Sequence, residues 1–158
     1  MQSASHIADQ VLHAEQLYHR LVLVVGGPRS GKTRSVRAAA SAAGWPVVNV
    51  NLQLCERLLE VPRRQRPIRA ARIFGEIVEA QASPIVVLDN LEVVFDPELQ
   101  LNPLSLLQGL ARNVTLVVAW PGAYDGQTLV YAEPGHAEER KYVHPDALMV
   151  QLAPEESR

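Results

Sequence analysis

The residues with the clearest chemistry lie in one short segment, residues 26–33. The segment reads Gly-Gly-Pro-Arg-Ser-Gly-Lys-Thr and satisfies G-x-x-x-x-G-K-[ST] at every fixed position. In such a loop the backbone N–H groups turn toward one anion, and the helix that follows points its positive dipole end at the same anion. We therefore predict a nucleotide site formed by Gly26, Gly27, Pro28, Arg29, Ser30, Gly31, Lys32, Thr33 and the adjacent Arg34.

Two side chains of this segment have predicted roles of their own. Lys32 supplies a positive charge for the β- and γ-phosphates of ATP, and the Thr33 hydroxyl is placed to ligate Mg²⁺. Gly26 and Gly31 leave room for backbone torsions and close approach that a Cβ would obstruct. The alternative is a glycine-rich turn that carries Lys-Thr by chance, with an accidental strand before it and an accidental helix after it.

A second acidic segment has the form of a Walker B strand. Four apolar residues, 85–88, precede Asp89, whose carboxylate would hold Mg²⁺ together with Thr33. Where P-loop hydrolases of the additional-strand type often have glutamate next, this chain has Asn90, which can orient a water but cannot accept its proton. Glu92 is either the missing acid or a solvated surface carboxylate. The candidate catalytic residues are Lys32, Asp89, Asn90 and Glu92, and slow hydrolysis is compatible with them.

The elements around these residues alternate between strand and helix patterns. Residues 21–25 before the loop are apolar and of strand length, and the alanine-rich run 34–43 favours a helix that stops at Gly44 and Pro46. Further predicted helices cover residues 5–19, 52–60, 68–80 and 103–110; further predicted strands cover 47–50, 85–88 and 114–120, with short ones at 129–131 and 148–150.

This alternation predicts an α/β fold. We expect a three-layer P-loop NTPase domain with a mainly parallel sheet, an AAA/RecA-like core without a helical lid domain. It would be a single domain of residues 1–158, with a leading helix in 1–20 and a polar tail in 132–158. Sequence order does not decide whether strand 47–50 also lies between the strands of the loop and of Asp89 in space.

Composition narrows the function classes. The chain of 158 residues is 47% hydrophobic and 20% charged, as in an ordinary globular protein, and its net charge of −2 gives no global attraction to nucleic acid. Cys55 is the single cysteine, which excludes an internal disulfide and fits a cytoplasmic location. The sequence contains no Cys/His metal cluster, no membrane-spanning apolar run and no signal-peptide pattern.

Arginines supply the remaining candidates. Six of them fall within sixteen residues, as a phosphate-contacting patch for DNA, RNA or a nucleotide, or as a solvated helix face: Arg57, Arg63, Arg64, Arg66, Arg69 and Arg72. Arg112 is either an arginine finger toward a neighbouring subunit or a cation that stabilises a helix C-terminus. Trp120 is expected in the core rather than in the nucleotide pocket.

Several segments resemble the BrxF family, the small P-loop proteins of type 3 BREX bacteriophage-defence systems. The resemblance runs roughly from residue 20 to 142 and depends on residues 49–52, 57–60, 63–66, 88–97, 106–113 and 132–136. It implies a bacterial or archaeal cytoplasmic protein that acts with other defence proteins. These include a larger ATPase, a DNA methyltransferase and a phosphatase-like protein, with DNA somewhere in the assembly.

Three functions therefore stay open at this point. The first is a regulatory ATPase or nucleotide switch that binds ATP and Mg²⁺ and forms homo-oligomers with nucleotide. The second is a small P-loop kinase in which the arginine cluster clamps phosphate. The third is a nucleotide-binding interaction protein with negligible hydrolysis, which Asn90 keeps open.

Overall fold

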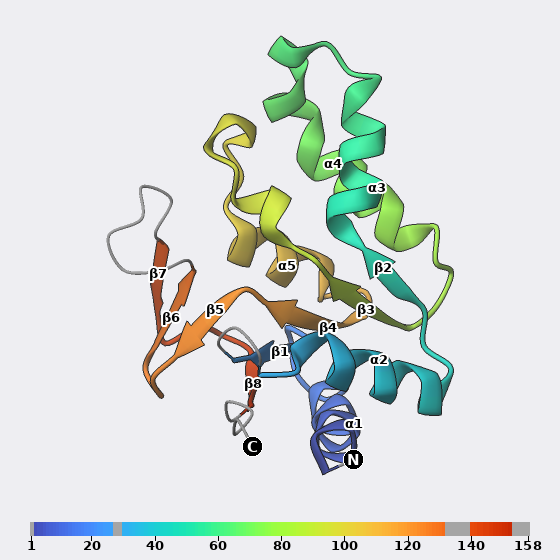
Figure 1. Ribbon diagram of the computed structural model, residues 1–158, viewed down its shortest axis with the longest axis vertical. Helices are drawn as coiled ribbons and strands as arrows, with labels where there is room; N and C mark the ends of the chain where they lie inside the picture. The colour runs from blue at the N-terminus through green and yellow to red at the C-terminus, as the bar shows by residue number, and fades with distance from the viewer. Residues whose placement is uncertain (1, 27–29, 132–139, 153–158) are drawn as a thin grey trace.

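The computed structural model describes residues 2–26, 30–131 and 140–152. Figure 1 shows a central sheet with helices on both faces and a smaller sheet at one side. The helices are α1 (Gln2–Ala14), α2 (Lys32–Ala43), α3 (Val50–Leu59), α4 (Arg66–Glu79) and α5 (Pro103–Leu110), with short 3₁₀ turns η1 (Arg63–Gln65), η2 (Glu92–Phe95) and η3 (Pro97–Leu99). The strands are β1 (Leu21–Val25), β2 (Val47–Asn49), β3 (Ile85–Asp89), β4 (Thr115–Trp120), β5 (Gly122–Tyr124), β6 (Thr128–Tyr131), β7 (Arg140–Val143) and β8 (Leu148–Gln151).

The central sheet has five strands in the order β2-β3-β4-β1-β8, and every pairing within it is parallel. Strand β4 lies between β1, which leads into the phosphate loop, and β3, which ends in Asp89. This is the additional-strand arrangement expected of an AAA/RecA-like core. It also answers the question left by sequence order, because β2 lies outside β3 at the edge of the sheet.

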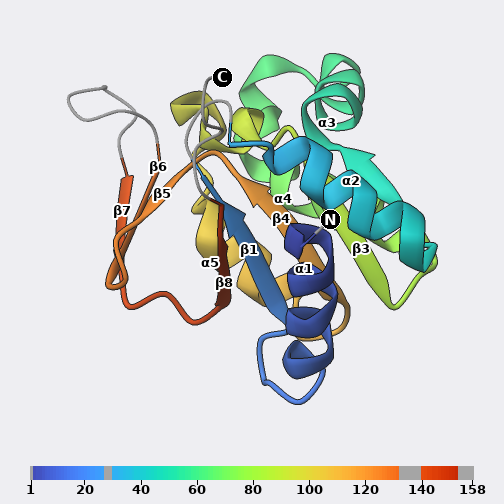
Figure 2. The same ribbon diagram turned by 60° about the horizontal axis from the view of Figure 1, so that its bottom comes forward.

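Two apolar clusters make this a three-layer structure. Leu21, Leu23 and Val25 of β1 pack into the cluster that includes residues of α3, α4 and α5, whereas Val22 and Val24 pack with α1 and α2. The side chains of a strand alternate between its two faces, so β1, which is buried along its whole length, belongs to both clusters. In Figure 1, α1 and α2 lie below the sheet and α3, α4 and α5 above it; Figure 2 shows α1 and α2 in front of β1, β4 and β3. The expected fold class is confirmed.

Most expected elements are present, with shifted ends. Helix α3 begins two residues earlier than expected because the side chain of Asn49 caps it, accepting a hydrogen bond from the Leu52 N–H at 3.1 Å. Helix α1 ends at Ala14 rather than 19, and residues 15–18 are all exposed, so no apolar face continues there. The two short strands expected at 129–131 and 148–150 are present as β6 and β8.

The end of the chain contributes more structure than a polar tail. Strand β8 pairs with β1 in the central sheet, and its Val150 is fully buried. Strands β5, β6 and β7 form an antiparallel sheet, of which β5 and β7 were not expected. Strand β7 has only four residues, and Arg140 and Lys141 are followed directly by Tyr142 and Val143. It therefore lacks the alternation of apolar and polar residues by which a strand is predicted from sequence.

The described residues that follow α5 form strands, and no helical lid is found among them. None of the helices in the described ranges is both long and apolar enough to pass through a membrane.

Trp120 joins the two sheets. It is fully buried, donates a hydrogen bond from Nε1 to the Val130 carbonyl at 3.0 Å, and makes an edge contact with Phe95 at 5.1 Å between ring centroids. The expectation of a core tryptophan is confirmed.

We predict that Gly122→Ala destabilises the protein by about 1–3 kcal/mol, because the added Cβ would overlap the Val130 carbonyl and lie 2.9 Å from Trp120 Nε1. Gly109→Ala is the matched control: it lies in α5 with nothing within 4 Å of the added Cβ, and should stabilise the protein by up to about 1 kcal/mol through helix propensity. Denaturant unfolding of both variants measures the difference, and equal stabilities would contradict the packing described for Trp120.

Candidate functional site

The phosphate loop and Asp89 lie at the same edge of the central sheet. Because β1, β4 and β3 run parallel, their carboxyl ends meet there, and α2 begins at Lys32 directly after the loop. Of the predicted loop residues, Gly27, Pro28 and Arg29 lie outside the described residues. Gly26, Ser30, Gly31, Lys32, Thr33 and Arg34 are described, and they surround the head of α2.

The described loop residues have the close packing that a phosphate loop requires. A Cβ on Gly26 would overlap the side chain of Ser30, so only glycine fits. Gly31, the N-cap of α2, has φ 84° and ψ 23°, a left-handed conformation that glycine adopts without a steric penalty. No side chain caps the helix there, so the first N–H groups of α2 are available to an anion.

Lys32 is half-buried and folds back onto its own loop. Its Nζ donates a hydrogen bond to the Gly26 carbonyl at 2.6 Å. Burial lowers the pKa of Lys32 from its ordinary value of 10.5, and attraction by Glu92 and then by Asp89 partly opposes this shift. The ammonium therefore has two carboxylates near it in a partly desolvated place, where a polyphosphate would be a stronger partner.

Thr33 and Asp89 are in direct contact. Thr33 Oγ1 donates a hydrogen bond to Asp89 Oδ1 at 3.2 Å, which joins the first turn of α2 to the end of β3. The Asn90 N–H donates to the same Oδ1 at 3.0 Å. Only 3% of the Asp89 side chain is exposed, and its Oδ2 makes no hydrogen bond to any described residue.

These two residues suit Mg²⁺. A hydroxyl and a carboxylate are the hard oxygen ligands that Mg²⁺ prefers, and the buried Oδ2 is an acceptor that lacks a hydrogen bond within the described residues. Thr33 and Asp89 would hold the metal, and the N–H groups at the head of α2 together with Lys32 would hold the phosphates. The residues that the sequence pattern selected are therefore suited to hold Mg²⁺ and a polyphosphate.

Glu92 is held by Asn51, a residue to which the sequence analysis gave no functional role. Asn51, in the first turn of α3, donates from Nδ2 to Glu92 Oε2 at 2.8 Å and accepts at Oδ1 from the Val93 N–H at 2.8 Å. Its own N–H donates to the Asn90 carbonyl at 2.8 Å. Asn51 thus fixes the segment after β3, and the Glu92 carboxylate of that segment attracts the Lys32 ammonium, which partly opposes the lowering of the Lys32 pKa by burial. A polar residue just beyond β2, the strand paired with β3, was the available signal.

Asn90 takes part mainly through its backbone. It has φ 55°, and its N–H and carbonyl bond to Asp89 and Asn51 as described. Such a left-handed turn is tolerated by asparagine better than by most residues and reverses the chain directly after β3. The proposed role of the Asn90 amide in orienting water stays a prediction.

Arg37, which the sequence analysis passed over, also approaches the site. Its Nε lies 3.6 Å from Asp89 Oδ2, and it extends from α2 one turn after Thr33. Arg34, a predicted nucleotide contact, lies exposed in the first turn of α2.

Three of the six arginines of the arginine-rich segment are held in ion pairs. Arg57 and Arg72 pair with Glu76 at 2.6 Å and 3.9 Å, and Arg63 pairs with Glu98 at 2.5 Å. Arg66 donates to the Val61 carbonyl at 3.0 Å, while Arg64 and Arg69 are exposed near the turn between α3 and α4.

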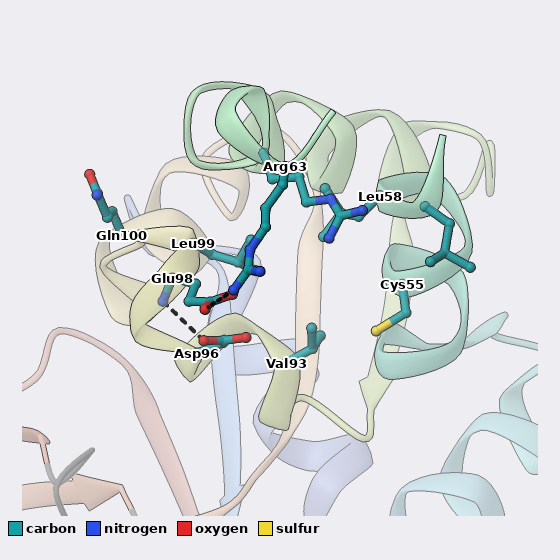
Figure 3. A pocket seen from close by; sticks show the side chains of 10 residues that line it. Cys55, Leu58, Arg63, Val93, Asp96, Glu98, Leu99 and Gln100 are labelled. Carbon is teal, nitrogen blue, oxygen red and sulfur yellow. Dashed lines mark hydrogen bonds and ion pairs between the residues drawn. The ribbon is translucent and has the colours of Figure 1, made fainter. Parts of the chain in front are cut away.

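A pocket of about 440 Å³ lies between α3 and the turns η2 and η3. Figure 3 shows Arg63 reaching across it to Glu98, with Cys55 and Leu58 on the α3 side. Its lining residues include none from the phosphate loop. The pocket is therefore distinct from the nucleotide site, which we assign from the loop itself.

Arg112 lies at the amino ends of the parallel strands, whereas the phosphate loop lies at their carboxyl ends. It precedes β4, whose Leu116 is level with the first residue of β1, and its guanidinium covers the Tyr18 ring at 4.6 Å. The length of β1 separates it from the phosphates, which is about 17 Å for five residues. Arg112 therefore cannot be a finger toward its own nucleotide.

The comparisons with known proteins found solved structures of low sequence identity. No family model and no curated protein matches it. A solved DNA replication initiation factor aligns at TM-score 0.49 and 13% identity, over 94% of this chain and 44% of that one. The structure of C. elegans PCH-2 aligns at TM-score 0.46 and 16% identity, over 79% of this chain and 38% of that one. The chain thus spans less than half of each, and the fold assignment rests on strand order.

We predict that Lys32→Met stabilises the nucleotide-free protein slightly and abolishes its stabilisation by ATP. The lowered pKa of Lys32 means that the folded state disfavours the ammonium. The resulting loss of folding stability is complete at any pH below the pKa that Lys32 has in the folded state. It disappears as the pH rises to the pKa that Lys32 has in the unfolded chain, so the loss is present at neutral pH. Thermal unfolding with and without ATP and Mg²⁺ measures both effects; a nucleotide at a hundred times its Kd stabilises by about 2.7 kcal/mol. A variant that ATP still stabilises like wild type would exclude Lys32 from the site.

Proposed function

We propose that this protein is an ATP-binding P-loop ATPase or nucleotide switch that uses Mg²⁺. The observation that carries the proposal is the hydrogen bond between Thr33 and the buried carboxylate of Asp89 at the head of α2. It brings the two predicted metal ligands together although 56 positions separate them in the chain. In a glycine-rich turn that contained Lys-Thr by chance, no contact between the threonine and a buried aspartate would be expected.

The chemistry follows from the positions of these groups. The N–H groups at the head of α2 and the Lys32 ammonium bind the phosphate oxygens and stabilise the negative charge on them. When bound, Mg²⁺ supplies additional positive charge at the same oxygens. Thr33 and Asp89 would hold the metal at the N-terminal end of α2.

Glu92 is the group that we propose for activating water. Its carboxylate attracts the Lys32 ammonium and is held by Asn51, whereas the neighbouring Asn90 can orient a water but not accept its proton. The amide of Asn51 engages the Oε2 atom of this carboxylate. We propose slow turnover because Asn90, and not a glutamate, follows Asp89 directly, and a slowly hydrolysing protein would keep its nucleotide bound for much of its cycle, as a switch does.

The proposal extends to assembly and partners. The resemblance to the BrxF family supports a cytoplasmic role in a multi-component phage-defence assembly, with a larger ATPase among the partners. We also propose a nucleotide-dependent homo-oligomer, in which Arg112 would contact the terminal phosphate of a neighbouring copy, because it lies too far from its own loop. Direct DNA contact would fall to the exposed Arg64 and Arg69, because Arg57, Arg63 and Arg72 have acidic partners.

The alternative, an interaction protein with negligible hydrolysis, differs from the proposed function in the role of Glu92. If Glu92 only anchors the segment after β3 through Asn51, ATP binds and stays. The rate of ATP turnover, compared between wild type and the Glu92→Gln variant, separates the two functions.

We predict that Glu92→Gln lowers ATP turnover by about 10²-fold or more with little change in ATP affinity, because glutamine keeps the shape but cannot accept a proton. Phosphate release under saturating ATP, together with calorimetric ATP binding, measures this. Asp89→Ala is the companion variant and should weaken binding only when Mg²⁺ is present. Unchanged turnover in Glu92→Gln would remove Glu92 from catalysis, and failure of the wild type to bind ATP would refute the proposed function.

We also predict that the wild type gains mass on addition of ATP and Mg²⁺, as measured by light scattering after size-exclusion chromatography. Lys32→Ala should keep the same mass in all conditions, and Arg112→Ala should bind ATP normally yet turn it over slowly. An identical wild-type mass with and without nucleotide would reject nucleotide-dependent assembly.

A further inference from the structure

The second carboxylate oxygen of Asp89 has an unusual neighbour. Thr33 and the Asn90 N–H both bond to Oδ1, whereas Oδ2 makes no hydrogen bond within the described ranges and lies 3.6 Å from Arg37 Nε. The pair joins a side chain that is 3% exposed to one that is 54% exposed. A guanidinium thus approaches, from the solvent side, the carboxylate that would help to hold Mg²⁺.

Helix geometry explains why Arg37 is there. Residues four apart lie on the same face of a helix, so Thr33 and Arg37 both face the end of β3. Side chains in a helix also lean toward its N-terminus, which brings the Arg37 guanidinium back toward Thr33 and Asp89. Lys32 is also attracted by this carboxylate, but its Nζ donates a hydrogen bond to the Gly26 carbonyl.

A buried carboxylate is costly without a positive partner. In the nucleotide-free protein Arg37 is in place to be that partner, and it stays charged at any physiological pH. In the nucleotide complex Mg²⁺ would bring its own charge to the same carboxylate, and two cations there repel each other. Because the Arg37 side chain is long and half-exposed, it can withdraw into water when the metal arrives.

We infer that Arg37 is a built-in counter-cation of Asp89 that Mg²⁺ displaces, and that it thereby sets the Mg²⁺ concentration that nucleotide binding requires. The inference rests on the proposed nucleotide site for its second half only. It makes Arg37 a residue that tunes metal affinity through Asp89, without contact to the phosphates. Its two consequences have opposite signs, since Arg37 stabilises the metal-free protein and weakens metal binding.

The test compares Arg37→Gln with Arg37→Lys and with Arg72→Gln, a matched control that removes an exposed arginine from α4. In calorimetric titrations of ATP at a series of Mg²⁺ concentrations, Arg37→Gln should reach half-maximal binding at about two- to fivefold less Mg²⁺ than wild type, as expected for a partly exposed ion pair. Arg37→Lys should stay closer to wild type, and ATP binding in EDTA should be unchanged.

A second measurement needs no nucleotide. In EDTA, the melting temperature of Arg37→Gln should fall below that of Arg72→Gln, because Asp89 loses its counter-cation. Equal melting temperatures, or an unshifted Mg²⁺ midpoint, would overturn the inference. Weaker ATP binding by Arg37→Gln in EDTA would also overturn it, since Arg37 would then contact the phosphates. If the wild type binds no ATP at any Mg²⁺ concentration, the proposed function fails, and the melting temperatures in EDTA still decide whether Arg37 is the counter-cation.

Discussion

The buried carboxylate of Asp89 is the constraint around which this end of the molecule is organised. A carboxylate that is 3% exposed needs hydrogen bonds and positive charge close by, and here they come from Thr33, the Asn90 N–H and Arg37. Meeting that need brings the head of α2 against the end of β3. Lys32 is then positioned beside Thr33 and Asp89, the proposed metal ligands, because it directly precedes Thr33 in the chain.

The sheet supplies the geometry that makes this meeting possible. Strand β4 lies between β1 and β3, so Thr33, which follows β1 in the chain, meets Asp89 at the end of a strand that is not adjacent to β1. The end of β4 is Trp120, which is fully buried and bonded to Val130. The small antiparallel sheet therefore packs against the strand that lies under the nucleotide loop. Strand β8 closes the other side of β1 and buries it completely.

Binding and hydrolysis are assigned to different parts of the structure. The proposed phosphate and metal contacts come from α2 and β3, whereas Glu92 belongs to η2 and is held by Asn51 of α3. Helix α3 also forms one wall of the pocket beside η2 and η3. In the proposed switch, this separation allows nucleotide to stay bound while turnover is slow.

The sequence alone determined the phosphate loop and the acid at the end of β3. It also determined the alternation of strands and helices and hence the α/β class. Each of these depends on a pattern of residues that are close together in the chain. The tertiary structure decided the place of β2 at the sheet edge, the entry of β8 into the central sheet, and the partners of Glu92 and Asp89. Asn51 and Glu92 are 41 positions apart, and Arg37 and Asp89 are farther still. Such pairs leave no local pattern, since only the packing of parallel strands and their covering helices brings them together.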